Sequence, residues 1–509
     1  MISKVKSCTL YGINGYLVDV EVDLSEGLPG FDLVGLPDSS IREAKERVRA
    51  AIKNSEFLFP IKRITVNLAP ADIRKEGSAF DLPIAVGILS CSQPIPADIL
   101  NKTMIVGELS LDGSVKPVNG ILPMVYSASQ NGITQCIVPY ENAEEGALVE
   151  NMEVIGVRTL KEVILHLQNE KPLFKTTVDV NSIMQNSVNS NLDFSDVKGQ
   201  VHVKRALEIS AAGSHNILMI GPPGSGKTMM ARRLPTILPD LSFKESIEIT
   251  KIYSVTGLLP NKKALINTRP FRAPHHTISN TALIGGGRIP KPGEVSLSHY
   301  GVLFLDELPE FNKNVLEVLR QPLEDREVTI SRINATLTYP ASFMLVCSMN
   351  PCPCGYLGDE EKCHCQPDQI KKYLSKISGP LLDRIDLQVE ASPVKYSDLD
   401  IREKSESSLS IKKRVLKAQK IQQERYKDES IFFNSQLSAA QIEKYCSLGD
   451  TERNLLKTAF EKLNLSARAY HRILKVARTI ADLDGEENIK LHHLSEAIQY
   501  RSLDRKYWA

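Results

Sequence analysis

The sequence has almost no net charge, and it contains no long apolar run. Its 62 lysines and arginines nearly balance 61 aspartates and glutamates, so the formal net charge is only +1. The chain as a whole therefore does not attract nucleic acid or an anionic membrane, and any contact with nucleic acid must come from local patches. No stretch approaches the roughly 20 apolar residues that a membrane span requires. We expect a cytoplasmic protein without a membrane partner.

Cysteines are few, and they are not distributed as in a secreted disulfide scaffold. Four of the nine form two Cys-x-Cys pairs, Cys352 with Cys354 and Cys363 with Cys365, separated by eight residues. Four close thiolates are typical of tetrahedral zinc ligation, although two Cys-x-x-Cys pairs would be the more usual spacing. His364 is an alternative ligand, and a reduced loop without metal is the alternative interpretation.

The chain is too long for one hydrophobic core, and we expect about three domains. Strand-like and helix-like segments alternate over residues 1–167, which predicts an α/β domain. Residues 168–192 are rich in asparagine and serine and predict a linker. A second α/β domain is expected over 193–395, and 396–509 predicts a helical C-terminal domain.

The N-terminal domain carries clear local signals. Alternating apolar residues over 15–24 predict a strand. Asp38 lies where an N-cap would begin a helix over 39–54. The pair Asp112-Gly113 is typical of a hairpin turn. These segments predict a self-contained domain.

A nucleotide-binding motif opens the second domain. An apolar segment over 216–220 is followed by the pattern G-x-x-x-x-G-K-T and by a helix-like segment. This is the order of a P-loop, in which glycines let backbone N–H groups surround phosphates at a helix N-terminus. Lys227 would reach the β- and γ-phosphates of ATP, and Thr228 would bind Mg²⁺. The predicted ATP-binding residues are Gly221, Pro222, Pro223, Gly224, Ser225, Gly226, Lys227 and Thr228.

Two further apolar segments end in polar residues that suit phosphate chemistry. Asp306 and Glu307 follow the segment 301–305, and Asn350 ends a later one. Buried parallel strands deliver such side chains to the sheet edge where phosphates bind. Asp306 would bind Mg²⁺, Glu307 would polarise the attacking water, and Asn350 would hydrogen-bond that water or the γ-phosphate. With the P-loop, they predict hydrolysis of ATP.

Arginines follow these motifs at positions from which they could act on a phosphate. Arg384 lies near a predicted subunit edge, and Arg468 and Arg472 lie on a predicted helix of the last domain. An arginine directed at the γ-phosphate stabilises charge on the transferred group, and if a neighbouring subunit supplies it, hydrolysis requires a ring. A surface salt bridge is the alternative for each arginine taken singly.

Seven motifs occur in a fixed order: DVKGQ, GPPGSGKT, FRAPHHTIS, VLFLDELPEF, SMNPCPCG, SGPLLDRIDL and SARAYHRILKVARTIADLD. In this order they resemble the bacterial YifB/ComM family of magnesium-chelatase-like AAA+ ATPases over nearly the entire chain. The resemblance implies an α/β fold with three parts. These are an N-terminal domain similar to Lon protease and ribosomal protein S5, an AAA+ parallel-sheet core, and a C-terminal helical lid.

The resemblance also implies roles and partners. It makes Lys227 and Thr228 Walker A residues, and Asp306 and Glu307 Walker B residues. It makes Asn350 sensor 1, Arg384 the arginine finger and Arg468 sensor 2. It further implies a homohexameric helicase that acts on single-stranded or branched DNA, promotes branch migration in natural transformation, and works beside recombination proteins.

Two inserted segments are candidates for DNA contact. By the same resemblance, Arg272–His299, which contains Arg288 and Lys291, is similar to a helix-2 insertion, and 326–340 is similar to a hairpin with Arg332 near its tip. Either could contact a phosphate backbone. An ordinary glycine-rich loop and hairpin are the equally weighted alternative.

The N-terminal domain resembles the Lon protease fold, in which a serine and a lysine cut peptides. The best local match places Ala79 at the serine position and Leu122 at the lysine position, and neither can act as nucleophile or base. Ser78 and Lys75 lie so close to the matched position that a register shift of one or two residues could restore half of the dyad. We expect a non-catalytic scaffold.

Several functions remain open at this level. The leading hypothesis is a hexameric DNA-dependent ATPase that moves along DNA. An ATP-driven remodeller of proteins is one alternative. A magnesium-chelatase subunit is another, although the chain lacks the D-x-S-x-S metal motif of the partner subunit. An ATP-dependent peptidase is disfavoured by Ala79 and Leu122.

Overall fold

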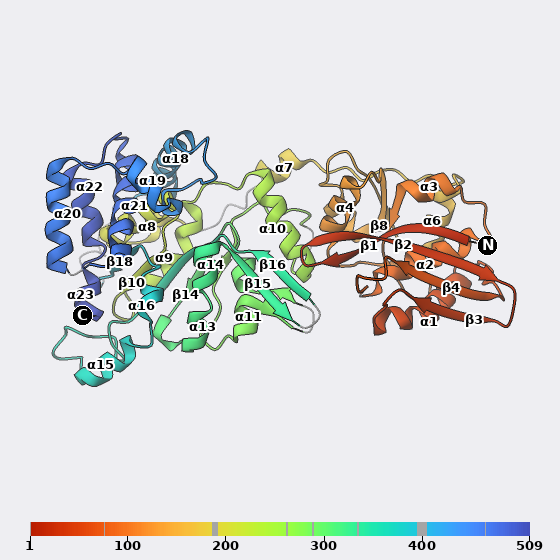
Figure 1. Ribbon diagram of the computed structural model, residues 1–509, viewed down its shortest axis with the longest axis horizontal. Coiled ribbons are helices and arrows are strands. Elements are labelled where there is room, and N and C mark those ends of the chain that lie inside the picture. Colours follow the sequence, from red (N-terminus) through yellow and green to blue (C-terminus); the bar gives the residue numbers. More distant parts are fainter. Residues whose placement is uncertain are drawn as a thin grey trace. The chain divides into compact units, whose positions relative to one another are not determined.

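The computed structural model describes residues 2–75, 77–185, 192–260, 263–287, 290–332, 335–393, 405–463 and 465–508 (Figure 1). The chain divides into two compact units. The first consists of Met1–Ser187 with Ser242–Asn267, and the second of Val188–Leu241 with Thr268–Ala509. Each unit is built on one main sheet with helices packed against it.

The first unit contains a seven-stranded mixed sheet. In spatial order its strands are β3 (Gly30–Val34), β4 (Arg63–Ala69), β2 (Asn14–Ser25), β1 (Ile2–Tyr11), β5 (Thr103–Ile105), β8 (Gln135–Pro139) and β9 (Glu153–Val157). The β1–β2 and β2–β4 pairs are antiparallel, and the other neighbours are parallel. A small hairpin pairs β6 (Glu108–Leu109) with β7 (Val115–Lys116), around the predicted turn. The predicted strand over 15–24 is confirmed as β2.

Seven helices of the first unit precede residue 186: α1 (Ser39–Asn54), α2 (Asp81–Ser90), α3 (Ala97–Lys102), α4 (Ile121–Gln130), α5 (Ala143–Gly146), α6 (Leu160–Leu167) and α7 (Val180–Gln185). The N-cap of α1 is Asp38, whose carboxylate accepts the Ile41 N–H at 2.9 Å, so the predicted cap is confirmed. Buried residues recur along α1 at helical spacing, and this buried face lies against α2 and the core of the unit. α7 lies inside the segment predicted as a linker.

Helix α10 (Phe243–Thr256) belongs to the first unit, although the sequence placed it in the second domain. It packs on α4 (Figure 1), and it buries Ile249, Ile252 and Tyr253. The Ser254 hydroxyl donates to the Glu145 carboxylate, and burial raises the pKa of this carboxyl. Residues 192–241 thus belong to the second unit, and the chain returns to the first unit at Ser242, just before α10.

The second unit contains a five-stranded parallel sheet. In spatial order its strands are β11 (Phe271–Arg272), β14 (Val302–Leu305), β17 (Met344–Met349), β10 (Ile217–Ile220) and β18 (Leu387–Glu390). All side chains of β10, β14 and β17 are buried, as expected for strands covered on both faces. Short hairpins pair β12 (Gly285–Gly286) with β13 (Lys291–Pro292), and β15 (Glu327–Arg332) with β16 (Ala335–Pro340).

Helices around this sheet are α8 (Val201–Gly213), α9 (Lys227–Arg233), α11 (Asn280–Ile284), α12 (Glu294–Leu297), α13 (Lys313–Glu317), α14 (Arg320–Asp325), α15 (Pro367–Leu374) and α16 (Gly379–Leu382). The C-terminal part is helical, with α18 (Ser408–Arg425), α19 (Ala439–Tyr445), α20 (Asp450–Leu463), α21 (Ala467–Asp484), α22 (Leu491–Gln499) and α23 (Leu503–Trp508). The predicted α/β class, with a parallel-sheet core and a helical C-terminal part, is confirmed. Among the helices of the described ranges, none is both long and apolar enough to cross a bilayer.

Candidate functional site

The predicted nucleotide residues meet at the carboxyl edge of the five-stranded sheet. β17 lies between β10 and β14, and all three strands are parallel. The P-loop begins directly after β10. Asn350 is the first residue after β17, and Asp306 is the first residue after β14. Residues that are far apart in the chain are therefore neighbours at one edge, where open parallel sheets bind ligands.

The P-loop has the backbone that its glycines allow. Gly224 and Gly226 have φ of 77° and 83°, a region that favours glycine, and α9 begins at Lys227. The Lys227 ammonium donates to the carbonyls of Gly221 and Pro222 at 2.7 and 2.9 Å, and it lies 3.4 Å from Asn350 Oδ1. Burial lowers the pKa of Lys227. The N-terminus of α9 and this ammonium form a site suited to phosphate.

Asp306 and Thr228 form the oxygen-rich part of the site. The Thr228 hydroxyl donates to Asp306 Oδ2 at 2.7 Å, and the Ser348 hydroxyl donates to Asp306 Oδ1. A hydroxyl and a carboxylate held together are the hard oxygen ligands that Mg²⁺ prefers, so these residues fit that ion. Ser348 orients the carboxylate, a contact that sequence reasoning missed. The only signal was a polar residue two positions before Asn350 in an apolar strand.

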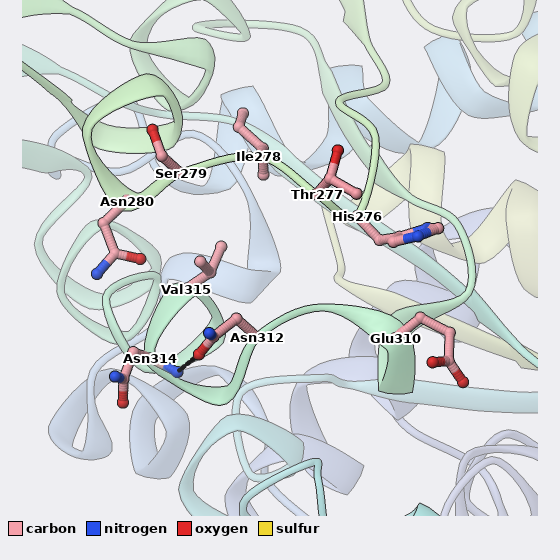
Figure 2. Close-up of a pocket in the computed structure, with 9 residues that line it drawn as sticks. All are labelled: His276, Thr277, Ile278, Ser279, Asn280, Glu310, Asn312, Asn314 and Val315. Atoms are coloured by element: carbon pink, nitrogen blue, oxygen red, sulfur yellow. Dashed lines mark hydrogen bonds between the residues drawn. The ribbon is translucent and has the colours of Figure 1, made fainter.

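Glu307 contacts the first inserted segment. It has φ of 53°, and its Oε2 lies 3.7 Å from Nδ1 of His276. The His276 ring lies 4.0 Å from that of His275, measured between centroids. His276 also borders a cavity of about 540 Å³, formed with Thr277–Asn280 and with residues just after Glu307 (Figure 2). His276 lies within the predicted insertion Arg272–His299, but the sequence did not connect it with Glu307.

Arg384, the predicted arginine finger, lies away from this edge. A second cavity, of about 280 Å³, lies at the amino edge of this sheet. It is lined by the residues that immediately precede β10, β17 and β18, which are Asn216, Phe343 and Asp386. Arg384 lines it too. Four residues of β10 separate this amino edge from the P-loop, which is about 13 Å along the strand. Arg384 is therefore at the opposite edge from its own chain's P-loop.

The second cavity is rich in cations. Besides Arg384, its cationic lining residues are Arg326, Arg472 and Lys475. Burial lowers the pKa of Lys475 to about 8 and that of Arg326 to about 10. Such desolvated cations favour an anion nearby. The sequence gave no sign that Arg326 and Lys475 would join this group, because they come from distant segments.

Arg384 itself is nearly buried, with 10% of its side chain exposed. It pairs with Glu324 and donates to the Pro380 carbonyl at 2.7 Å, while its buried Nε has no hydrogen-bond partner among the described residues. Arg468 is 64% exposed and lies 3.4 Å from the carboxylate of Asp383, next to Arg384. The structure thus places Arg384 and Arg468 in one region, apart from Lys227.

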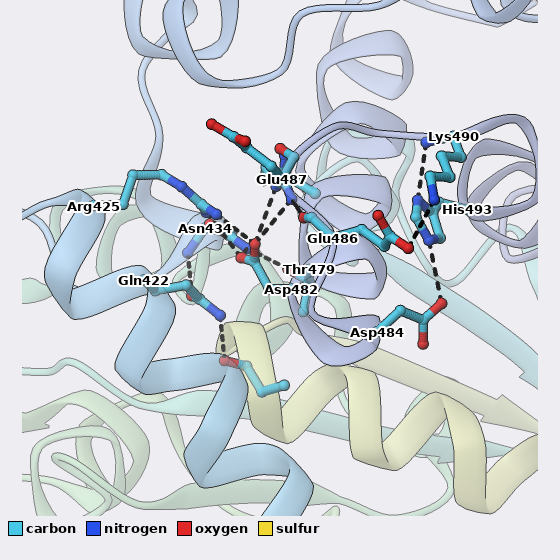
Figure 3. Close-up of polar contacts among 12 residues, drawn as sticks. Gln422, Arg425, Asn434, Thr479, Asp482, Asp484, Glu486, Glu487, Lys490 and His493 are labelled. Carbon is cyan, nitrogen blue, oxygen red and sulfur yellow. Dashed lines mark hydrogen bonds and ion pairs between the residues drawn. The ribbon is translucent and has the colours of Figure 1, made fainter.

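Buried ion pairs hold helix α21, which carries Arg468, Arg472 and Lys475. Arg472 pairs with Asp386, which immediately precedes β18. Burial alone would raise the pKa of the Asp386 carboxyl, but Arg472 and His215 hold this pKa well below its usual range. Near the other end of α21, Asp482 accepts from Arg425, Asn434 and Arg478, as Figure 3 shows in part. Both ends of the helix are therefore fixed to neighbouring elements.

The four cysteines come together in space. Their Sγ atoms all lie within 4.8 Å of one another, and three of the separations are 3.4, 3.7 and 3.9 Å. Four sulfurs placed tetrahedrally around zinc at about 2.3 Å would be about 3.8 Å apart. The cluster in Cys352–Cys365 therefore has the size of a zinc site.

In the N-terminal unit the residues of the possible dyad have other partners. The Ser78 hydroxyl donates to the Glu108 carboxylate, and the Lys75 ammonium donates to the Pro70 carbonyl. Ala79 and Leu122 are buried. The non-catalytic scaffold stays a prediction.

The inserted segments contact each other. The Tyr339 hydroxyl of β16 donates to the Pro290 carbonyl at 2.6 Å, and a Cβ on Gly286 would lie 3.2 Å from Nη2 of Arg332. The hairpin β15–β16 and the insertion at β12–β13 therefore form one surface. The predicted contact residue Arg288 lies outside the described residues.

Comparison with known proteins covers almost the whole chain. Three family models match: "Magnesium chelatase, subunit ChlI" over residues 193–399, "Subunit ChlI of Mg-chelatase" over 20–142, and "Magnesium chelatase, subunit ChlI C-terminal" over 405–501. These matches imply ATP and Mg²⁺ as the cofactors.

Relatives of similar length also match. The competence protein ComM of Haemophilus influenzae is 47% identical over 499 residues, which is 97% of this chain and 96% of the relative. The uncharacterized protein YifB of Escherichia coli is 43% identical over 511 residues, or 99% and 98% of the two chains. Lon protease 2 of Bacillus subtilis is 30% identical over 183 residues, 31% of this chain and 32% of that protein. The chain belongs to the YifB/ComM family of magnesium-chelatase-like AAA+ proteins.

Proposed function

We propose that the protein is an ATP-hydrolysing motor that assembles as a homohexamer and acts on DNA, with branch migration in recombination as its task. The observation that carries the proposal is the division of the machinery between two edges of one sheet. Lys227, Asp306 and Asn350 lie at the carboxyl edge, and Arg384 lies at the amino edge. One chain therefore carries both halves of a site that two chains would complete.

ATP hydrolysis follows from the residues at the carboxyl edge. The backbone N–H groups of Gly224–Thr228 and the Lys227 ammonium would bind the phosphates, and Thr228 and Asp306 would hold Mg²⁺, which neutralises charge on the phosphate oxygens. Glu307 would orient water and accept its proton as the water oxygen attacks the γ-phosphorus. The bond to the β–γ bridging oxygen breaks, and ADP and phosphate leave. Asn350 would hold the water in line.

A neighbouring subunit would supply the remaining charge. Arg384 is buried beside Arg472 in a cationic cavity, and its partner Glu324 is 64% exposed and so open to exchange for a phosphate oxygen. Arg468 lies close by, through Asp383. An arginine supplied in this way stabilises the transferred phosphoryl group only when the ring is assembled.

DNA is the proposed substrate for two reasons. The Haemophilus relative is named a competence protein, and the two inserted segments of this chain form one surface that carries Lys291 and Arg332. Lysine and arginine on a local patch can bind phosphates even when the whole chain is nearly neutral. His276 joins this insertion to Glu307, so that DNA contact could influence hydrolysis.

Zinc is the metal ion that we propose for the cysteine cluster. The Sγ separations fit tetrahedral ligation, and thiolates prefer zinc to Mg²⁺. The metal would be structural, because all four positions are filled by protein.

A magnesium-chelatase subunit is the second candidate, because all three family models bear that description. It would require a partner subunit with the metal-binding motif. Porphyrin metallation that appears only when such a partner is added would favour it over the DNA motor. A protein remodeller would instead show ATPase stimulation by an unfolded protein.

The steady-state ATPase rate tests the proposal directly. The protein would be assayed alone and with single-stranded, duplex and branched DNA, with Glu307→Gln as the background control. Stimulation that is greatest with branched DNA would support the motor. A rate unaffected by every DNA would reject DNA as the substrate while leaving ATP hydrolysis in place.

A further inference from the structure

The first pair of cysteines lies against the nucleotide site. Gly355 directly follows Cys354, and a Cβ placed on Gly355 would lie 2.6 Å from Cδ of Pro223 and 3.7 Å from Cγ of Asn350. Cys352 is fully buried, and its carbonyl accepts the Gly355 N–H at 3.0 Å, which closes the turn. This turn therefore touches both the P-loop and Asn350.

The second pair of cysteines is held by a different element. Cys365 lies two residues before α15, whose Tyr373 and Leu374 are buried. The Cys363 N–H donates to the Asp359 carbonyl at 2.8 Å, so the intervening segment makes its own local turn. The thiolate cluster joins the turn at Gly355 to the start of α15. A metal bound there would fix one to the other.

We propose that zinc in this cluster positions the P-loop for ATP, so that ATP affinity depends on zinc. The inference rests on the zinc site proposed above and deepens it. Pro223 has a ring-locked φ, so a displacement of its ring moves the following Gly224 N–H, which belongs to the phosphate-binding backbone. Small misplacements of binding groups have large effects on affinity and rate.

A matched pair of glycines tests the contact itself. Gly355 and Gly358 have φ of 89° and 94°, but a Cβ on Gly358 would have no atom within 4 Å, whereas one on Gly355 would meet Pro223. Both substitutions to alanine carry the same backbone strain. We expect Gly355→Ala to weaken ATP binding by about tenfold, the effect of losing one hydrogen bond to a phosphate oxygen. Gly358→Ala should bind ATP normally.

A second experiment separates the zinc site from its coupling to ATP. Zinc per chain would be measured by mass spectrometry of the metal, and the ATP dissociation constant with a fluorescent ATP analogue, for the full chain and for Cys354→Ser/Cys365→Ser. Cys91→Ala is the control, because Cys91 lies in the other unit. One zinc per chain that is lost in the double variant, together with weaker ATP binding, supports the inference.

The other outcomes are distinct. Zinc lost with unchanged ATP affinity would overturn the coupling and leave the zinc site standing. A wild-type chain without zinc would overturn the site itself. Equal ATP affinity in Gly355→Ala and Gly358→Ala would overturn the contact between the loop and the P-loop, whatever the zinc content.

Discussion

Mixing two inactive variants tests whether Arg384 acts on a neighbouring chain. Arg384→Ala keeps Glu307, and Glu307→Gln keeps Arg384, so neither protein alone has a complete site if each site uses one residue from each of two chains. In rings formed at random from equal amounts, half of the subunits offer Glu307 and half of their neighbours offer Arg384. About one quarter of the interfaces would be complete, and we expect about one quarter of the wild-type ATPase rate.

The same structure predicts that Arg384→Ala still folds. Its partner Glu324 is 64% exposed, so removal of the arginine leaves no buried carboxylate without a partner, and we expect a stability loss of only about 1 kcal/mol. The assay is phosphate release after the two proteins are unfolded, mixed and refolded together, and circular dichroism checks their folding. A mixture of Glu307→Gln with Arg453→Ala, an exposed arginine elsewhere on the lid, serves as the reference. If the mixture of Arg384→Ala and Glu307→Gln is no more active than either of these two variants alone, a role of Arg384 in trans is refuted.

Three further predictions concern the same machinery. Lys227→Ala should lose ATP binding, whereas Glu307→Gln should bind ATP and fail to release phosphate; normal turnover by Glu307→Gln, measured as phosphate release, would contradict the assignment. Lys475 is charged below its pKa of about 8 and neutral above it, so ATPase activity that depends on the cationic cavity should fall as pH rises through 8, and Lys475→Arg should remove this fall. His276→Gln should keep the ATPase rate without DNA and reduce its stimulation by DNA; unchanged stimulation would exclude the link to Glu307.

Local sequence patterns predicted the elements that depend on neighbouring residues in the chain. The P-loop, the Asp38 cap of α1 and the buried strand before Asp306 are such cases, because glycine, cap and periodicity signals act within a few residues. The two cysteine pairs were also visible, but only the fold shows that their sulfurs lie at zinc-site distances. Tertiary assembly determines this spacing.

Contacts that depend on distant segments could not be predicted. The cavity around Arg384 combines residues that follow α14, precede β18 and lie on α21, and no local pattern relates them. The segment Ser242–Asn267 lies between two ATP-site motifs in sequence, yet its apolar residues pack on α4, because burial there outweighs proximity along the chain. Sequence order alone therefore predicted domains made of continuous segments, whereas each of the two units combines two separate segments of the chain.

This interleaving has a consequence for how such proteins can evolve. A gene fusion or truncation that cuts within 168–192 would appear to separate the two units cleanly, but it would remove the segment Ser242–Asn267 from the first unit, and Leu265 of this segment is buried in a core of that unit. Loss of the buried Leu265 side chain alone would cost about 1.5–3 kcal/mol. The N-terminal unit and the ATPase core are thus inherited together, since the first part of the gene does not encode every buried residue of the N-terminal unit.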